Sequence, residues 1–260
     1  MKFRAKRSLG QNFLIDKNIL KKIVESGNIS KEDNILEIGP GSGNLTEYLI
    51  KSKPKNIIVV EKDFELIKIL ENKFREDIKI INNDVLKLSD SFYNDKFVIF
   101  GNLPYNISTK ILSNWCLNKK AEFKKLILMF QKEVADRIIA KVNTKDYSRI
   151  TILANWKFNI KKILDVNPDC FTPKPKIKST LLEFIPKKSF IELKNPRNLE
   201  KITNLFFNQR RKMIKKNFKR LFNNFDTIAK KYNVKLTDRP QRLSVNKFLM
   251  IIKEYENNLN

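Results

Sequence analysis

Histidine is absent from the 260-residue chain, and cysteine occurs only twice. The absence of imidazole excludes Ser-His-Asp and Cys-His catalysis, and it argues against a zinc site. The two cysteines, Cys116 and Cys170, lie far apart in the sequence without metal-type spacing, so we interpret each as a small core residue. Any chemistry must therefore proceed without imidazole, and we expect no metal.

Long apolar runs and acidic residues are also scarce. No run approaches the roughly 18 apolar residues of a membrane-spanning helix, and residues 1–7 are basic, unlike the apolar core of a signal peptide. We therefore expect no membrane partner. The two widely separated cysteines fit a cytoplasmic protein, and the sequence leaves a bacterial cytoplasm and an organelle both open. Lys and Arg total 53 against 28 Asp and Glu, a formal charge of +25. This excess favours a polyanionic partner, most simply nucleic acid.

Up to Pro186, short apolar runs alternate with segments of helical spacing. Strands are predicted at 34–38, 56–60, 78–82, 97–100 and 126–130, and a late strand pair at 162–166 and 180–185. Helices are predicted at 16–25, from about 44, and at 64–74, 108–117, 131–138 and 150–156. We expect the helix at 64–74 to bury Phe64, Ile67 and Leu70. The order predicts an α/β fold, a doubly wound Rossmann-like sheet that is mostly parallel with a late antiparallel strand.

The sequence changes character after Pro186. Residues 187–198 are polar and indicate a linker, so we predict one domain at 1–188 and a small all-helical domain at 189–260. Seven cations fall between Arg210 and Arg220, in a stretch that we predict to be helical and that has no acidic residue from Lys201 to Phe225. A solvated helix face is the alternative, but the uncompensated charge favours phosphate contact. The candidate contacts are Lys6, Arg7, Arg210, Arg211, Lys212, Lys215 and Lys216.

Polar or glycine residues follow three of the predicted strands. Gly39-Pro40-Gly41-Ser42-Gly43 follows the first, Glu61 ends the second and Asp84 follows the third. Glycines allow close backbone approach to a ligand, and an acid about 20 residues after such a turn is typical of ribose binding. Asn44 stands where the dinucleotide fingerprint has its third glycine. The pattern therefore favours an adenosine-containing ligand other than a nicotinamide cofactor.

The turn Asn102-Leu103-Pro104-Tyr105 follows the fourth predicted strand. Asn102 offers an amide oxygen, Tyr105 offers a flat ring, and Pro104 stiffens the turn. This set suits a planar substrate with an exocyclic amine, such as a nucleobase. A plain strand-to-helix turn with an Asn cap is the alternative. Phe171, in a proline-stiffened loop, is either a loop anchor or a second stacking surface.

Together these motifs resemble the ribosomal RNA adenine N6,N6-dimethyltransferase family. The matching segments are 9–14, 37–43, 102–108, 131–134, 171–176 and 207–212. Gln131-Lys132-Glu133-Val134 and Asn208-Gln209-Arg210-Arg211-Lys212 resemble the members that act on the small subunit, whereas Lys178 departs from the acid that this group often has. The resemblance implies S-adenosylmethionine as methyl donor, with S-adenosylhomocysteine as product.

The resemblance also implies a substrate and a partner. It points to two adjacent adenosines in a hairpin near the 3′ end of small-subunit rRNA, in the immature small ribosomal subunit. We expect a monomer, although the sequence itself does not give the oligomeric state. Methylation of large-subunit rRNA, methylation of DNA adenine, and a non-catalytic ribosome-assembly or transcription factor on the same fold remain the alternatives.

The family's functional residues map onto this chain at matching positions. The Asn102 side-chain oxygen and the Leu103 carbonyl would accept the two N6 hydrogens, and Tyr105 and Phe171 would stack on the base, with Pro104 holding the turn. The implied cofactor-binding residues are Asn12, Leu14, Gly39, Gly41, Glu61, Asp84 and Asn102. Glu37 would orient the glycine loop or touch the ligand.

Overall fold

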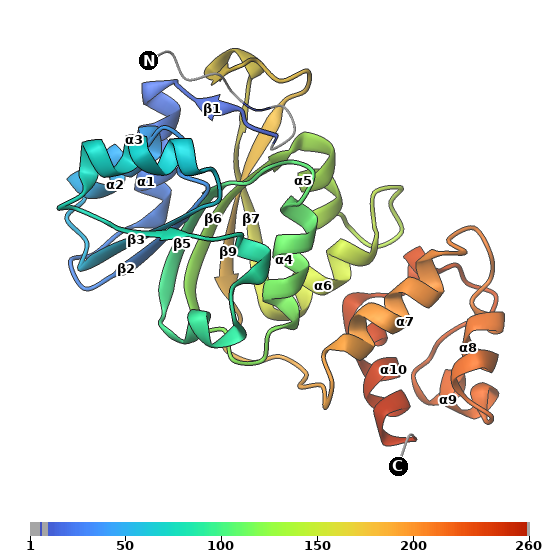
Figure 1. Cartoon of the computed structure of the whole chain (residues 1–260). Coiled ribbons are helices and arrows are strands. Elements are labelled where there is room, and N and C mark those ends of the chain that lie inside the picture. Colours follow the sequence, from blue (N-terminus) through green and yellow to red (C-terminus); the bar gives the residue numbers. More distant parts are fainter. Residues whose placement is uncertain (1–5, 7–9, 259–260) are drawn as a thin grey trace. The chain divides into compact units, whose positions relative to one another are not determined.

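The computed structural model describes residue 6 and residues 10–258. The chain forms two compact units (Figure 1). The first comprises the chain up to Trp115, Lys119–Ala135 and Asn159–Pro186, and the second comprises Cys116–Asn118, Asp136–Phe158 and the chain from Lys187 onward. The second unit therefore includes two segments, 116–118 and 136–158, that precede the predicted boundary. The domain boundary at 188/189 stays a prediction.

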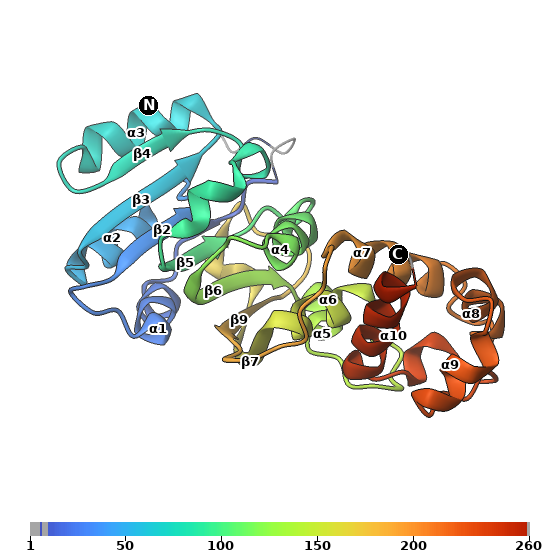
Figure 2. The same ribbon diagram turned by 90° about the horizontal axis from the view of Figure 1, so that it is seen from below.

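A central sheet organises the first unit. Within the described residues its strand order is β4-β3-β2-β5-β6-β9-β7, which Figure 2 shows from one edge to the other. The strands are β2 (Asn34–Ile38), β3 (Asn56–Glu61), β4 (Lys79–Asn82), β5 (Phe97–Asn102), β6 (Phe123–Gln131), β7 (Phe158–Val166) and β9 (Ser179–Pro186). Pairing from β4 through β6 is parallel, and β9 is antiparallel to β6. The predicted doubly wound sheet with a late antiparallel strand is confirmed.

The strand order brings the predicted ligand residues to one edge. β2 lies between β3 and β5, with Ile38 level with Val60 on one side and Gly101 on the other. The chain order therefore reverses direction at β2, and crevices at such switch points are where open α/β sheets bind ligands. The glycine turn follows β2, and Glu61 and Asn102 are the last residues of β3 and β5, so all three lie at this edge.

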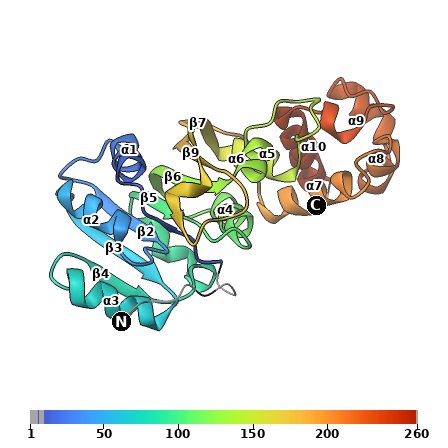
Figure 3. The same cartoon turned by 90° about the horizontal axis from the view of Figure 1, so that it is seen from above.

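Three helices cover one face of the sheet (Figure 1): α1 (Lys17–Gly27), α2 (Asn44–Lys51) and α3 (Phe64–Phe74). Their apolar side chains join alternate strand residues in one buried cluster. Across the sheet from α1 lies α4 (Ser108–Leu117), as Figures 2 and 3 show. The burial predicted for Phe64 is wrong, because this side chain is 60% exposed. Leu66 completes the buried stripe instead, and at about 100° per residue Phe64 lies outside it.

A second, two-stranded sheet was not predicted. β1 (Phe13–Leu14) pairs antiparallel with β8 (Phe171–Thr172), with Leu14 opposite Phe171. The pairing joins the N-terminal segment to the proline-stiffened loop. Short 3₁₀ helices at Val85–Lys87, Asp90–Asn94 and Pro168–Cys170 complete the described part of this unit.

The second unit is helical and has its own core. Its helices are α6 (Arg149–Lys157), α7 (Arg197–Phe207), α8 (Lys215–Leu221), α9 (Phe225–Lys231) and α10 (Val245–Asn257), with a 3₁₀ turn at Pro240–Arg242; α5 (Lys132–Ile138) spans the division between the units. The Phe206 ring packs edge-on against Phe218 and Phe248. The segment interpreted as a linker is held in place, because Glu256 accepts hydrogen bonds from Lys194 N and Asn195 N.

The basic stretch of this unit does not form one helix, so that prediction is wrong. α7 ends at Phe207 and α8 begins at Lys215, which places Arg210, Arg211 and Lys212 in the connecting turns. Among the described residues, no helix combines the length and apolar character needed to cross a membrane.

Candidate functional site

A cavity opens where β2, β3 and β5 end. Within the described residues it is lined by almost every side chain or turn that the sequence singled out: Asn12, Leu14, Gly39, Gly41, Glu61, Asp84, Asn102, Leu103, Pro104 and Tyr105. Phe171 is not among the lining residues. The fold therefore brings together residues that are up to 93 positions apart in the chain.

Two of the three glycines of the turn, Gly39 and Gly41, have different roles at the cavity. Both adopt positive φ, +67° at Gly39 and +60° at Gly41, a region that side chains disfavour. A Cβ added to Gly39 would meet nothing within 4 Å, so open space lies next to this backbone. A Cβ at Gly41 would lie 2.7 Å from the Phe13 ring. Gly39 thus borders the cavity, and Gly41 lets the N-terminal segment pack on the turn.

Glu61 is a nearly buried carboxylate at the end of β3. Its Oε1 accepts hydrogen bonds from Lys62 N and Asp63 N, both at 2.8 Å, and Gly41 N lies 3.4 Å from Oε2. Burial raises the pKa of Glu61, and the backbone donors oppose that rise. Since Oε1 is held by two backbone groups, Oε2 is the oxygen best placed to accept from a ligand hydroxyl.

Asp84 follows β4 and also lines the cavity. Its Oδ1 accepts from Leu86 N at 3.0 Å, and its Oδ2 lies 3.0 Å from Lys62 Nζ. Burial alone would raise the pKa of Asp84, but the Leu86 and Lys62 contacts lower it. The side chain is therefore an ionised acceptor that can take an additional N–H donor, since each carboxylate oxygen has two lone pairs.

Glu37 is buried beside the glycine turn. Thr46 Oγ1, on α2, donates to Glu37 Oε2 at 2.7 Å. Burial raises the pKa of Glu37 to about 8, and the nearby Glu61 charge adds to the rise. Of the two roles considered for Glu37, orienting the turn agrees with this bond, because Thr46 belongs to the helix that the turn begins.

The side-chain amide of Asn102 uses one polar atom in a hydrogen bond and can accept another hydrogen bond with the second. Its Nδ2 donates to Asn12 O at 2.8 Å, which fixes the side-chain orientation. The oxygen Oδ1 is the remaining acceptor of this side chain, and the residue lines the cavity. Ile107 N and Ser108 N both donate to Pro104 O, so the turn passes directly into α4.

Tyr105 and Phe171 are held in different ways. The Tyr105 hydroxyl lies 2.6 Å from Ser179 Oγ on β9, a bond that fixes the ring at the cavity wall. Phe171 is 3% exposed and belongs to the buried apolar cluster together with Leu14 and Leu181. The structure agrees with a loop anchor at Phe171, and its stacking on a base stays a prediction.

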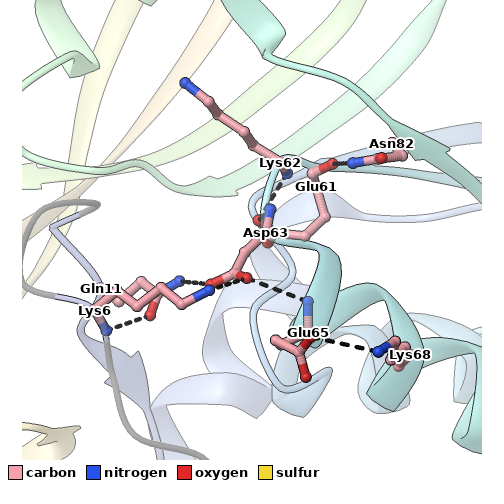
Figure 4. A network of polar contacts seen from close by, with 8 residues as sticks. All are labelled: Lys6, Gln11, Glu61, Lys62, Asp63, Glu65, Lys68 and Asn82. Carbon is pink, nitrogen blue, oxygen red and sulfur yellow. Dashed lines mark hydrogen bonds and ion pairs between the residues drawn. The ribbon is translucent and has the colours of Figure 1, made fainter.

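Sequence reasoning missed the residues that hold the N-terminal segment. Asn44 Nδ2 donates to Leu14 O at 2.8 Å, which gives the departure from the glycine fingerprint a structural reason. Asp63, the N-cap of α3, binds Lys6 and Gln11 (Figure 4). The cap itself could have been found from an Asp before an amphipathic segment, but its partners lie more than 50 residues away.

The second unit carries a cationic groove, which is lined by Asn143 and by some of the side chains of residues 207–219 and 237–242; Asp238 is not one of them. Its basic lining residues are Arg210, Arg211, Lys212, Lys215, Lys216, Lys219, Arg239 and Arg242. Arg210 is partly committed, since its guanidinium donates to the carbonyls of Thr144 and Lys145. Lys6 forms an ion pair with Asp63 in the first unit, and Arg7 lies outside the described residues. Those described residues include no cluster of His, Cys, Asp and Glu that could hold a metal.

Comparison with known proteins gives a consistent result. The family model for ribosomal RNA adenine dimethylase matches residues 2–257. A "Ribosomal RNA small subunit methyltransferase A" from Pelagibacter ubique is 55% identical over 256 residues, covering 97% of both chains. The protein of the same name from Malacoplasma penetrans is 42% identical over 258 residues, covering 98% of this chain and 93% of its own.

Solved structures show the same architecture. A dimethyladenosine transferase from Plasmodium falciparum superposes with a TM-score of 0.79 at 26% identity, covering 94% of this chain and 98% of its own. The 23S rRNA methyltransferase ErmE shares the fold, with a TM-score of 0.69, 23% identity, and coverage of 94% and 99%. The chain belongs to the ribosomal RNA adenine dimethylase family and is an S-adenosylmethionine-dependent rRNA methyltransferase.

Proposed function

We propose that S-adenosylmethionine binds in the cavity at the ends of β2, β3 and β5. The residues fit its chemistry: open space lies beside Gly39, Glu61 Oε2 can accept from ribose hydroxyls, and Asp84 can accept from an adenine amine. Asn12 and Leu14 would close the methionine end. When bound, this molecule supplies the methyl group and leaves as S-adenosylhomocysteine, and no metal is required.

Asn102 would bind the target adenine through its free amide oxygen. The adenine N6 lone pair is delocalised into the ring, so N6 is a poor nucleophile. Hydrogen bonds from N6 to Asn102 Oδ1 and to the Leu103 carbonyl would localise that lone pair and stabilise the positive charge that develops on N6. The hydrogen bond from Asn102 Nδ2 to Asn12 O is the main support for this proposal. Since that bond uses the amide nitrogen, Oδ1 remains as the acceptor in a cavity that Glu61 and the glycine turn also line.

Tyr105 would stack on the adenine after the base leaves its own stack. Water can take the released proton after transfer, in agreement with a chain that lacks histidine. Phe171 could cover the second face of the base only by leaving the apolar cluster in which it packs.

We infer that the substrate is a pair of adjacent adenosines in a hairpin near the 3′ end of small-subunit rRNA. The names of the relatives at 55% and 42% identity support the choice of the small subunit. We expect the protein to act as a monomer on immature subunits. The groove of the second unit is lined by Arg211, Lys212, Lys215 and Lys216, and its described lining includes no acidic residue, which suits RNA phosphates.

The test is methyl transfer from labelled S-adenosylmethionine to unmethylated small subunits, with large subunits and DNA offered as parallel substrates, followed by mapping of the modified nucleotides. The proposal expects N6,N6-dimethyladenosine at two neighbouring positions near the 3′ end. Modification of large-subunit rRNA or of DNA instead would support the corresponding alternative. Binding to small subunits without any methyl transfer would favour a non-catalytic assembly factor.

A further inference from the structure

Asp63 has no role in the proposed cofactor or substrate contacts, yet it directly follows Glu61 and Lys62, which line the cavity. The Asp63 side chain is 1% exposed, and it accepts Lys6 Nζ on Oδ1 at 2.6 Å and Gln11 Nε2 on Oδ2 at 2.8 Å. Gln11 Oε1 in turn accepts from Lys6 N at 2.7 Å. The three residues therefore form a closed network (Figure 4). A nearly buried carboxylate is costly without a compensating cation, which Lys6 provides here.

The same residue also reaches the acid assigned to the ribose. Asp63 N donates to Glu61 Oε1 at 2.8 Å. The carboxylate of Asp63 further caps α3, with Glu65 N at 3.2 Å from Oδ1. The start of α3 therefore fixes the position of Asp63. From this position, the Asp63 N–H holds the Glu61 carboxylate, and the Asp63 side chain holds the N-terminal segment through Lys6 and Gln11.

Residues 11–14 contact the site at three places. Gln11 binds Asp63, Asn12 O accepts from Asn102 Nδ2, and Leu14 O accepts from Asn44 Nδ2 at the start of α2. The segment therefore spans from the strand end that carries Glu61 to the turn that carries Asn102. A change at Asp63 should therefore affect both the cofactor side of the cavity, at Glu61, and the substrate side, at Asn102.

We propose that Asp63 is a positioning residue for methyl transfer, which holds residues 11–14 against the cofactor cavity through Lys6 and Gln11. The proposal rests on the cofactor assignment made above. The lowered pKa of Asp63, which burial alone would raise but the Lys6 and Gln11 hydrogen bonds reduce, agrees with a charged carboxylate at neutral pH. Cofactor binding should accordingly depend on an ion pair whose two residues are not among those that line the cavity.

The experiment compares Lys6→Met with Lys6→Arg in the full-length protein. Met keeps the aliphatic stem without the charge, and Arg restores the charge. Lys68→Met is the matched control, since Lys68 pairs with Glu65 on the same helix at 3.4 Å, with both side chains about half exposed. Affinity for S-adenosylhomocysteine is measured by calorimetry without RNA, so that any role of Lys6 in RNA binding does not enter, and KM and kcat are measured separately.

We expect Lys6→Met to bind S-adenosylhomocysteine about threefold to tenfold more weakly, the range of a partly buried charged hydrogen bond. The KM for S-adenosylmethionine should rise with it, the salt dependence of binding should shrink, and Lys6→Arg should recover most of the affinity. Lys68→Met should match the wild type. An unchanged affinity in Lys6→Met, with or without a lower melting temperature, would overturn the positioning role. Failure of the wild type to bind would instead overturn the cofactor assignment.

Discussion

Replacing Glu61 by Gln tests the cofactor assignment at the level of one atom. The Gln carbonyl can keep the two backbone N–H bonds that Oε1 now accepts at 2.8 Å. The amide nitrogen then replaces Oε2, so a donor faces Gly41 N, and a ribose hydroxyl loses its charged acceptor. A hydrogen bond to a charged group contributes about 1.5–3 kcal/mol. We therefore expect affinity for S-adenosylhomocysteine to fall roughly 10- to 100-fold.

Calorimetric titration of the wild type and of Glu61→Gln measures this loss. Glu65→Gln is the control, because Glu65 undergoes the same chemical change four residues later with a side chain that is 54% exposed. Figure 4 shows both acids. An affinity within twofold of the wild type in Glu61→Gln would refute the assignment of Glu61 to the ribose.

The pH dependence provides a second check on the same variant. Burial raises the pKa of Glu61 above its usual 4.5. Because the ionised form is the acceptor, wild-type affinity should decline as the pH falls through this raised pKa. The decline should begin at higher pH than an ordinary glutamate would produce. Glu61→Gln has no such group and should lack this part of the pH profile.

Three further predictions concern other residues. Glu37→Gln should be more stable than the wild type at pH 9 and no more stable at pH 4, as measured by thermal unfolding. The reason is that the pKa of Glu37 is raised from 4.5 to about 8, so the wild type loses stability as the pH rises between these values. Tyr105→Phe removes the hydrogen bond to Ser179 and should lower the free energy of unfolding by about 1 kcal/mol, while kcat stays unchanged. Tyr105→Ala should also lose about 1–3 kcal/mol of base stacking, which the kinetics of methyl transfer would show. Arg211→Gln with Lys212→Gln should reduce the slope of log K against log salt for rRNA binding by roughly 1.5.

Each of these has a result that contradicts it. A wild type and a Glu37→Gln variant with parallel stability curves would mean that Glu37 ionises normally. Full activity in Tyr105→Ala would exclude stacking. For the groove, the control is Lys230→Gln with Lys253→Gln, the same charge change on exposed residues that do not line it. An equal loss of slope in both double variants would show that net charge, rather than the groove, binds RNA.

The sheet and the residues at its edge were predictable because each depends on local pattern. Apolar runs located β2, β3 and β5, and parallel strands that end together bring Glu61, Asp84 and Asn102 to one edge whatever the details of packing. The same kind of short-range rule applies to Asp16 before α1, whose side chain caps the helix by accepting hydrogen bonds from Asn18 N and Ile19 N.

The contacts that complete the site depend on long-range pairing, which local pattern does not contain. β1 and β8 have only two residues each, too few for any periodicity, and they join positions more than 150 apart. The bonds of Gln11 to Asp63 and of Asn44 to Leu14 follow from that docking. The exposure of Phe64 was missed for a different reason, since both 64-67-70 and 66-67-70 are helical stripes and only packing selects between them.

The central claim concerns the acceptor oxygen of Asn102, and Asn102→Ala tests it most directly. Single-turnover transfer of a labelled methyl group to unmethylated small subunits is measured next to calorimetric binding of S-adenosylhomocysteine. The account predicts that methyl transfer is lost while cofactor affinity stays within a few-fold of the wild type. Methyl transfer at the wild-type rate in Asn102→Ala would contradict it.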